Sequence, residues 1–141
     1  MSKKILLPVD LNNPKASLRP LEEALKLLDK DGELHVVSVM QKFGLAMVSG
    51  YFDEGFETKA LDAFGKALTA WVNENVPDGV NVRPHVLSGT IYDEIIRAAN
   101  RLSVDVIVMG SHRPEFQDYL LGPNAARVVR HAPQSVFVVR N

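Results

Sequence analysis

Two glycines and the start of a helix, all toward the end of the chain, have the chemistry of an anion site. Gly110 follows an apolar run, and Gly122 directly precedes a predicted short helix. Glycine lets a backbone approach a ribose or a phosphate closely. The first amides of a helix lie at the positive end of its dipole and can bind phosphate oxygens. Because the whole chain has a net charge of only −1, any such site must be local.

Three polar side chains belong to the same regions of the sequence. Asp10 follows the first apolar run, and it could be a ligand group or a cap or turn residue. Arg113 could supply a charge-assisted contact to phosphate oxygens, or it could be a solvated arginine. His112 could approach a ligand, pair with Asp118, or be a satisfied or exposed histidine. The sequence leaves these alternatives open.

Five short apolar segments, enriched in β-branched residues, predict strands. Four of them are apolar runs that lack clean alternation, which is typical of strands covered on both faces. The segment 80–87 alternates and contains Pro84, so we expect it at a sheet edge. The predicted strands comprise residues 5–9, 34–39, 80–87, 104–109 and 136–139.

Four segments between the predicted strands have the apolar spacing of amphipathic helices. Ser17 and Thr90 are predicted N-caps, and Asp93 has the position of a capping-box acid. Gly32 and Gly79 mark the ends of the first two helices. The residues expected to face a core are Leu21, Ala24, Leu25, Leu28, Ala60, Leu61, Phe64, Leu68, Trp71, Val72, Ile91, Ile95, Ala98, Ala99, Leu102, Ala125, Val128, Val129 and Ala132.

Strict alternation of strands and helices predicts an α/β fold, with a mostly parallel sheet, right-handed crossovers and helices on both faces. Ligands of such sheets bind beyond the carboxyl ends of the strands, where the winding reverses direction. Residues 8–10, 39–41 and 110–113 leave predicted strands at that edge with polar or glycine-containing sequence. The long segment 41–58 could be a packed excursion, a lid over a ligand or a docking surface for a partner.

The composition excludes several classes of protein. The 141 residues suit one domain, which we place at 1–141. No cysteine is present, which excludes disulfides and thiolate chemistry and fits a reducing compartment. Without a signal-peptide core, a membrane span or a broad charge field, we expect a cytoplasmic protein that binds neither nucleic acid nor membrane. His35, His85 and His131 are scattered and lack metal-ligand spacing, so we predict no metal site formed by the protein.

Four segments resemble the universal stress proteins, and the resemblance covers essentially the whole chain. They are residues 5–10 (ILLPVD), 34–39 (LHVVSV), 105–112 (DVIVMGSH) and 135–140 (SVFVVR). The runs 110–114 (GSHRP) and 119–122 (YLLG) are similar in particular to the F and G subgroup of bacterial members.

The resemblance implies a three-layer sandwich around a five-stranded parallel sheet of order 3-2-1-4-5, the adenine nucleotide alpha hydrolase-like fold. It also implies an ATP site with a Gly-x-x-Gly, spacer, Gly-Ser/Thr pattern. Asp10 and Val39 would contact the adenine end, and Gly110 and Gly122 would border the ribose and phosphates. The complete expected nucleotide site comprises Pro8, Val9, Asp10, Val39, Met109, Gly110, His112, Arg113, Gly122, Asn124 and Ala125.

The chain departs from that pattern in three places. Arg113 replaces the second glycine, the spacer before Gly122 is one residue shorter, and Pro123 replaces the hydroxyl residue that contacts phosphate. Pro123 removes a hydroxyl and a backbone N–H, although proline suits the first helical position. The amides of Asn124 and Ala125 remain for an anion. The departures favour adenosine recognition over tight triphosphate binding.

The sequence favours a stress-associated regulatory protein that binds ATP, ADP or AMP, with any Mg²⁺ carried by the nucleotide. It contains no Ser-His-Asp set in a defensible order, no paired carboxylates and no P-loop, so at most weak ATP hydrolysis or autophosphorylation is expected. The alternatives are an enzyme of nucleotide chemistry and a dimeric scaffold that no longer binds ATP. We expect a homodimer through strand 135–140, because an exposed edge strand needs cover, and an additional protein partner that the sequence does not identify.

Overall fold

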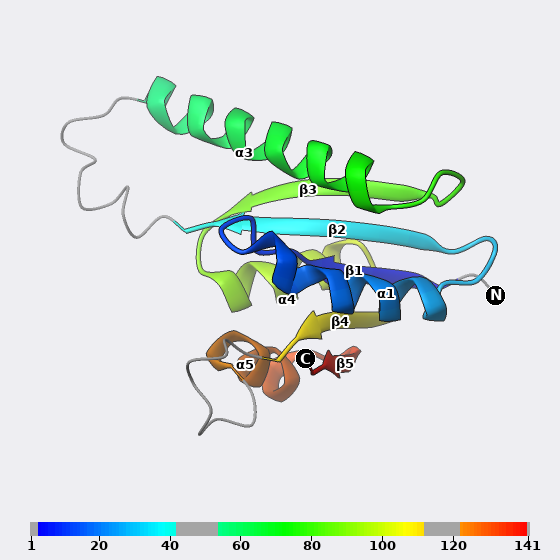
Figure 1. The fold of residues 1–141 in the computed structure, drawn as a ribbon. Coiled ribbons are helices and arrows are strands. Elements are labelled where there is room, and N and C mark those ends of the chain that lie inside the picture. The colour runs from blue at the N-terminus through cyan, green and yellow to red at the C-terminus, as the bar shows by residue number, and fades with distance from the viewer. Residues whose placement is uncertain (1–2, 42–53, 112–121, 141) are drawn as a thin grey trace.

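A parallel sheet of five strands forms the centre of the protein (Figure 1). The computed structural model describes residues 3–41, 54–111 and 122–140. The strand order is β3-β2-β1-β4-β5, which confirms the order that the family resemblance implied. The strands are β1 (Lys4–Pro8), β2 (Glu33–Met40), β3 (Val82–Ser88), β4 (Val106–Gly110) and β5 (Ser135–Val139).

Helices cover both faces of this sheet and complete the three-layer sandwich (Figure 1). One face carries α1 (Leu18–Leu27) and α3 (Glu54–Asn75), and a short 3₁₀ helix, η1 (Pro14–Ser17), leads into α1. The opposite face carries α4 (Ile91–Arg101) and α5 (Pro123–His131). Within the described ranges, no helix is both long and apolar enough to cross a membrane.

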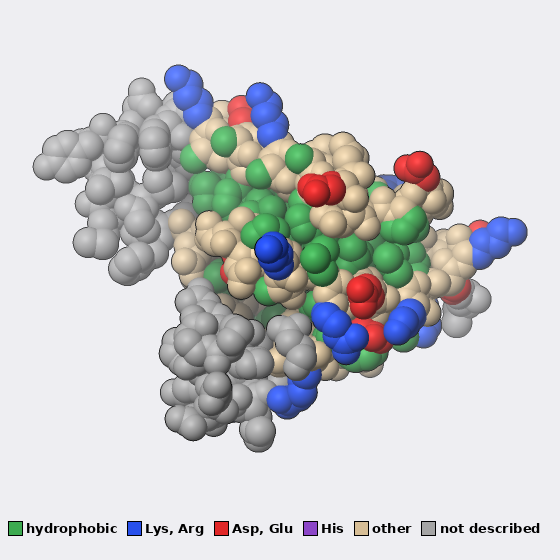
Figure 2. Space-filling view, viewed as in Figure 1, with side chains coloured by type: hydrophobic (Ala, Val, Ile, Leu, Met, Phe, Trp, Pro, Cys, Tyr) green, Lys and Arg blue, Asp and Glu red, His purple; other side chains and the backbone are tan. Residues whose placement is uncertain are grey.

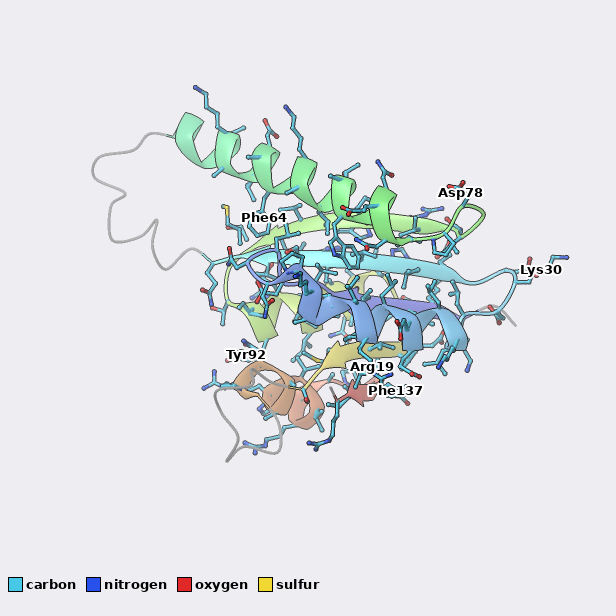
Figure 3. All side chains as sticks on the ribbon, in the orientation of Figure 1. Arg19, Lys30, Phe64, Asp78, Tyr92 and Phe137 are labelled. Carbon is cyan, nitrogen blue, oxygen red and sulfur yellow. The ribbon has the colours of Figure 1, made fainter. Side chains whose placement is uncertain are left out.

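Each face of the sheet has its own hydrophobic core, because successive strand residues point to opposite sides. Ile5 and Leu7 of β1 face α1 and α3, whereas Leu6 between them faces α4 and α5. Hydrophobic side chains gather between α1 and α3, with charged side chains mainly around them (Figure 2). On the other side, the Arg127 guanidinium of α5 lies 4.8 Å from the ring centre of Tyr92 on α4, and Figure 3 shows Tyr92 beside α5.

The apolar face predicted for the last helix, α5, was too wide. Ala125 and Val128 of α5 are buried, as expected, but Val129 is 44% exposed, so its assignment to a core was wrong. The reason is the position of α5, which packs against the edge strand β5 and α4 and therefore buries only a narrow face.

The predicted helix starts have the right positions, but Gly32 and Gly79 lie five and four residues beyond the last residues of α1 and α3 and do not cap them. Ser17 and Thr90 precede α1 and α4, yet neither side chain makes a capping hydrogen bond. Gly79 has φ +91°, a conformation that glycine adopts readily. Gly32 is required for a different reason, because a Cβ there would lie 2.8 Å from the Lys3 carbonyl oxygen.

Candidate functional site

The carboxyl ends of β1, β2 and β4 lie at one edge of the sheet, on the left in Figure 1. β1 pairs with β2 on one side and with β4 on the other, although β2 and β4 are far apart in the sequence. The winding of the chain therefore reverses direction between β1 and β4. Crevices at such switch points are where open α/β sheets bind their ligands.

A buried serine holds the ends of β1 and β2 together. The Val9 amide donates to the Val37 carbonyl (2.8 Å), and the Ser38 hydroxyl donates to the Val9 carbonyl (2.7 Å). Both Val9 and Ser38 are buried. The amide and carbonyl of Val9 are therefore already hydrogen bonded within the protein. Its role is to place Asp10 at the exposed carboxyl edge of the sheet. Ser38 was not among the residues predicted for the site.

Asp10 forms a tight turn directly after β1. Its Oδ1 accepts from the Asn12 amide (2.9 Å), and its carbonyl accepts from the Asn13 amide (3.0 Å). Its own amide donates to Ser17 Oγ (3.4 Å), a hydroxyl that makes no capping hydrogen bond to α1. Asp10 is thus a turn residue, one of the two expected alternatives, and it is exposed at the carboxyl edge of the sheet.

Three apolar residues of the predicted nucleotide site, Pro8, Val39 and Met109, lie at the carboxyl ends of β1, β2 and β4. Pro8 and Val39 are half-buried at the ends of β1 and β2. Met109 is buried in the core under α4 and α5, and Val39 packs against the same core. Met109 can therefore contribute to the floor of a site, while Pro8 and Val39 are more accessible.

Gly110 faces the protein rather than the open edge. A Cβ at this position would lie 3.5 Å from Pro20 Cγ and 3.7 Å from the Ala16 carbonyl oxygen, which is ordinary van der Waals contact. Any contact of Gly110 with a ligand would come from its backbone.

The start of α5 is fastened to the end of β4. The Gly122 amide donates to the Ser111 carbonyl, and the Ser111 amide donates to the Val139 carbonyl of β5 (3.0 Å). Pro123 is the first residue of α5, as expected. In the described part of the chain, no group accepts a hydrogen bond from the amides of Asn124 and Ala125. These two amides can serve an anion. His112 and Arg113 lie outside the described residues.

Replacing Ser38 by alanine is expected to lower the free energy of unfolding by about 1–3 kcal/mol, because the buried Val9 carbonyl would lose its side-chain partner. Urea unfolding of the purified variant measures this loss. Ser135→Ala is the matched control, since Ser135 is exposed at the start of β5. Equal stability of the two variants would contradict the role given to Ser38.

Two polar features between β2 and β3 were not anticipated. His35 and His85, expected to be scattered, lie with ring nitrogens 3.0 Å apart. The hydroxyl oxygen of Ser88 is buried and has no hydrogen-bond partner among the described residues. Both features depend on the register between the two strands, which the sequence alone does not specify. No group of three or more potential metal-binding side chains occurs in residues 3–41, 54–111 and 122–140.

Comparison with known proteins shows which family the chain matches and which solved structures share its fold. Residues 1–140 match the model of the universal stress protein family. The chain is 32% identical to universal stress protein G of Shigella flexneri, over 99% of this chain and 100% of that protein. A solved protein of Methanocaldococcus jannaschii has a TM-score of 0.81 at 24% identity, covering 100% of this chain and 97% of that one. A universal stress protein of Archaeoglobus fulgidus, solved in complex with dAMP, has a TM-score of 0.60 at 20% identity and covers 96% of each chain.

Proposed function

Because the chain belongs to the universal stress protein family, we propose that it binds an adenine nucleotide at the carboxyl edge of β1, β2 and β4. The observation that carries the proposal is the pair of amides at Asn124 and Ala125, in the first turn of a helix held beside the switch point, which engage no acceptor among residues 3–41, 54–111 and 122–140. The positive end of a helix dipole favours a phosphate at such amides. The complex of the Archaeoglobus protein with dAMP supports the choice of an adenine nucleotide.

The start of α5, where we place the phosphates, can bind only a few phosphate oxygens. Pro123 offers neither a hydroxyl nor a backbone N–H, so the start of α5 has two amides available instead of three. Asp10 at the opposite end presents an exposed carboxylate, which can accept hydrogen bonds from the adenine amino group or ribose hydroxyls. Adenosine and its first phosphate therefore supply most of the binding, and AMP, ADP and ATP are all ligands. Any Mg²⁺ arrives with the nucleotide.

The proposed role is regulatory rather than enzymatic. Nucleotide binding at the strand ends would alter the surface that the protein presents to a partner, in a cytoplasmic setting that suits a chain without cysteine. Mass spectrometry of small molecules released from freshly purified protein, followed by calorimetric titration with AMP, ADP and ATP, tests this role. Released adenine nucleotide or micromolar binding is expected. No released nucleotide and no heat with any of the three at millimolar concentration would contradict the proposal.

A second candidate function, a dimeric interaction scaffold, is favoured by the exposed edge of β5. Among the residues that the structure describes, this strand pairs only with β4, and its Phe137 side chain, on the same face as Val139 of the α1-side core, is 37% exposed. Figure 3 shows Phe137 at this edge of the sheet. An apolar edge strand is normally covered, and a second copy of the chain is the simplest cover.

Replacing Phe137 by glutamate is therefore expected to raise the dimer dissociation constant by about tenfold or more, because a charged group would lose water in the interface. Sedimentation equilibrium at micromolar concentration measures the change. Thr69→Glu is the control, since Thr69 is exposed on α3 over the opposite edge of the sheet. A wild-type protein of 15.6 kDa at every concentration would contradict the dimer.

A further inference from the structure

His35 of β2 and His85 of β3 meet on the face of the sheet that α4 covers. His35 Nδ1 and His85 Nε2 are 3.0 Å apart, the ring centres are 5.2 Å apart, and the ring planes differ by 26°. The nitrogen separation plus the two ring radii nearly equals the distance between the ring centres. The two nitrogens therefore lie close to the line that joins the rings, and the contact is a head-on N–H···N hydrogen bond rather than a stack of ring faces.

The neighbouring carboxylate determines which nitrogens carry protons. His35 Nε2 lies 3.3 Å from Glu33 Oε2, and an ionised carboxylate can only accept, so Nε2 carries a proton. In neutral His35, Nδ1 is then the acceptor, and His85 Nε2–H is the donor to it. We assign these tautomers from the hydrogen-bond pattern.

This arrangement has room for one extra proton but not for two. A first added proton goes to His35 Nδ1, on the ring that contacts the Glu33 carboxylate, and a hydrogen bond between the rings is kept if His85 carries its own proton on Nδ1 and accepts through Nε2. A second added proton must go to His85 Nε2. Two N–H groups and two positive rings would then face each other at the present separation of 3.0 Å. The hydrogen bond would be lost and replaced by repulsion.

Three other charged groups face the pair. Glu33 Oε1 lies 3.7 Å from an Arg83 guanidinium nitrogen, so the single carboxylate is shared between Arg83 and His35. Arg101 approaches from α4. Burial, followed by the charges of His35, Arg101 and Arg83, holds the pKa of His85 below its ordinary value of 6.5. The local field thus opposes added positive charge.

Protonation of the two histidines affects the fold because they join the edge strand β3 to β2. In the described part of the chain, β3 is an edge strand that pairs only with β2, and α3 makes most of its sheet contacts on β3. At the other end of this strand pair, the Gly89 amide donates to the Met40 carbonyl (3.0 Å), directly after Val39 of the candidate site. Loss of the bond between the histidines would weaken the attachment of β3 at its half-buried edge.

We propose that the His35–His85 pair is a pH-sensitive contact that fastens β3 to β2 at neutral pH and releases it on acidification. A metal-binding role is less compatible with the geometry. Both nitrogens point at each other rather than at a common third point, and the Glu33 carboxylate contacts the far side of the His35 ring.

The direction of the pH dependence follows from proton binding. Because the pKa of His85 is lowered in the folded protein, the unfolded chain binds more protons below pH 6.5. Stability is therefore retained above this pH and declines as the pH falls toward the lowered folded-state value. For one excess proton, the unfolding equilibrium constant rises by up to about tenfold per pH unit in this window.

The test compares urea unfolding at pH 7.5 and 5.5 in the wild type, His85→Gln and His131→Gln. Glutamine at position 85 can still donate to His35 but does not titrate, so we expect a shallower pH dependence for that variant. His131 is exposed at the end of α5, and its variant should keep the wild-type dependence. Equal pH dependence of all three proteins, or equal flattening in both variants, would overturn the proposal.

Two measurements on the wild-type protein keep the proposal testable even if His85→Gln does not fold. Amide hydrogen exchange should show a larger loss of protection in residues 82–88 than in residues 106–110 on acidification, after correction for intrinsic exchange. Histidine ring titration by NMR should place the pKa of His85 below 6.5. Uniform loss of protection across the sheet, or a His85 pKa at or above that value, would also overturn it.

Discussion

Replacing Asp10 by alanine is expected to weaken AMP binding by about tenfold to a hundredfold, the usual range for one hydrogen bond to a charged group. The carboxylate lies exposed beyond β1, at the edge where three strand ends and the start of α5 come together. Calorimetric titration of the variant with AMP measures the loss. Because Asp10 also forms a turn, a second variant is needed to distinguish loss of the ligand contact from loss of the turn.

Asp10→Asn separates the structural role of this residue from its ligand role. An asparagine oxygen can still accept from the Asn12 amide, so the turn is kept while the negative charge is removed. We expect an affinity for AMP between those of the wild type and Asp10→Ala. Asp31→Ala is the control, because Asp31 is exposed before β2 at the opposite edge of the sheet. Equal affinities for Asp10→Ala and Asp31→Ala would show that Asp10 only stabilises its turn.

Replacing Leu68 by alanine is expected to lower the free energy of unfolding by about 2–5 kcal/mol, the range for a large cavity in a core. Leu68 of α3 is 0% exposed and lies in the core between α3, α1 and the sheet. A loss of this size is a large fraction of the roughly 5–15 kcal/mol that stabilises a typical domain. Urea unfolding followed by circular dichroism measures it.

Leu18→Ala is the matched control for this experiment. Leu18 is the same residue type at the start of α1, but it is 38% exposed, so its truncation removes little buried area. We expect a change of about 0.5 kcal/mol or less. Similar losses for the two variants would contradict the packing of α3 described above.

The fold could be predicted because the apolar segments, the helices between them and Pro84 each favour one kind of structure. Predominantly apolar segments without strict alternation, such as 34–39 and 104–109, favour strands covered on both faces, and the helices between the strands favour a parallel sheet. Pro84 correctly indicated an edge strand, since it cannot donate to a second neighbour. Val129 was misassigned because helical spacing does not reveal how much of a short helix the sheet can cover.

The residues of the candidate site were harder to predict from the sequence than the fold. Asp10 and Gly122 could be found because they adjoin predicted elements at the edge where ligands bind. Ser38 could not, because its contact with the Val9 carbonyl depends on how two strands align. The same limit applies to His35 and His85, which are separated by 50 residues and meet only through the register of β2 with β3.

Amide mapping by NMR with added AMP would locate the bound nucleotide. We expect chemical-shift changes gathered at residues 8–12, 39–41, 110–111 and 124–125, the segments that meet at the carboxyl edge of the sheet. Unchanged spectra with millimolar AMP and ATP, or changes confined to other parts of the protein, would contradict a nucleotide site at this edge.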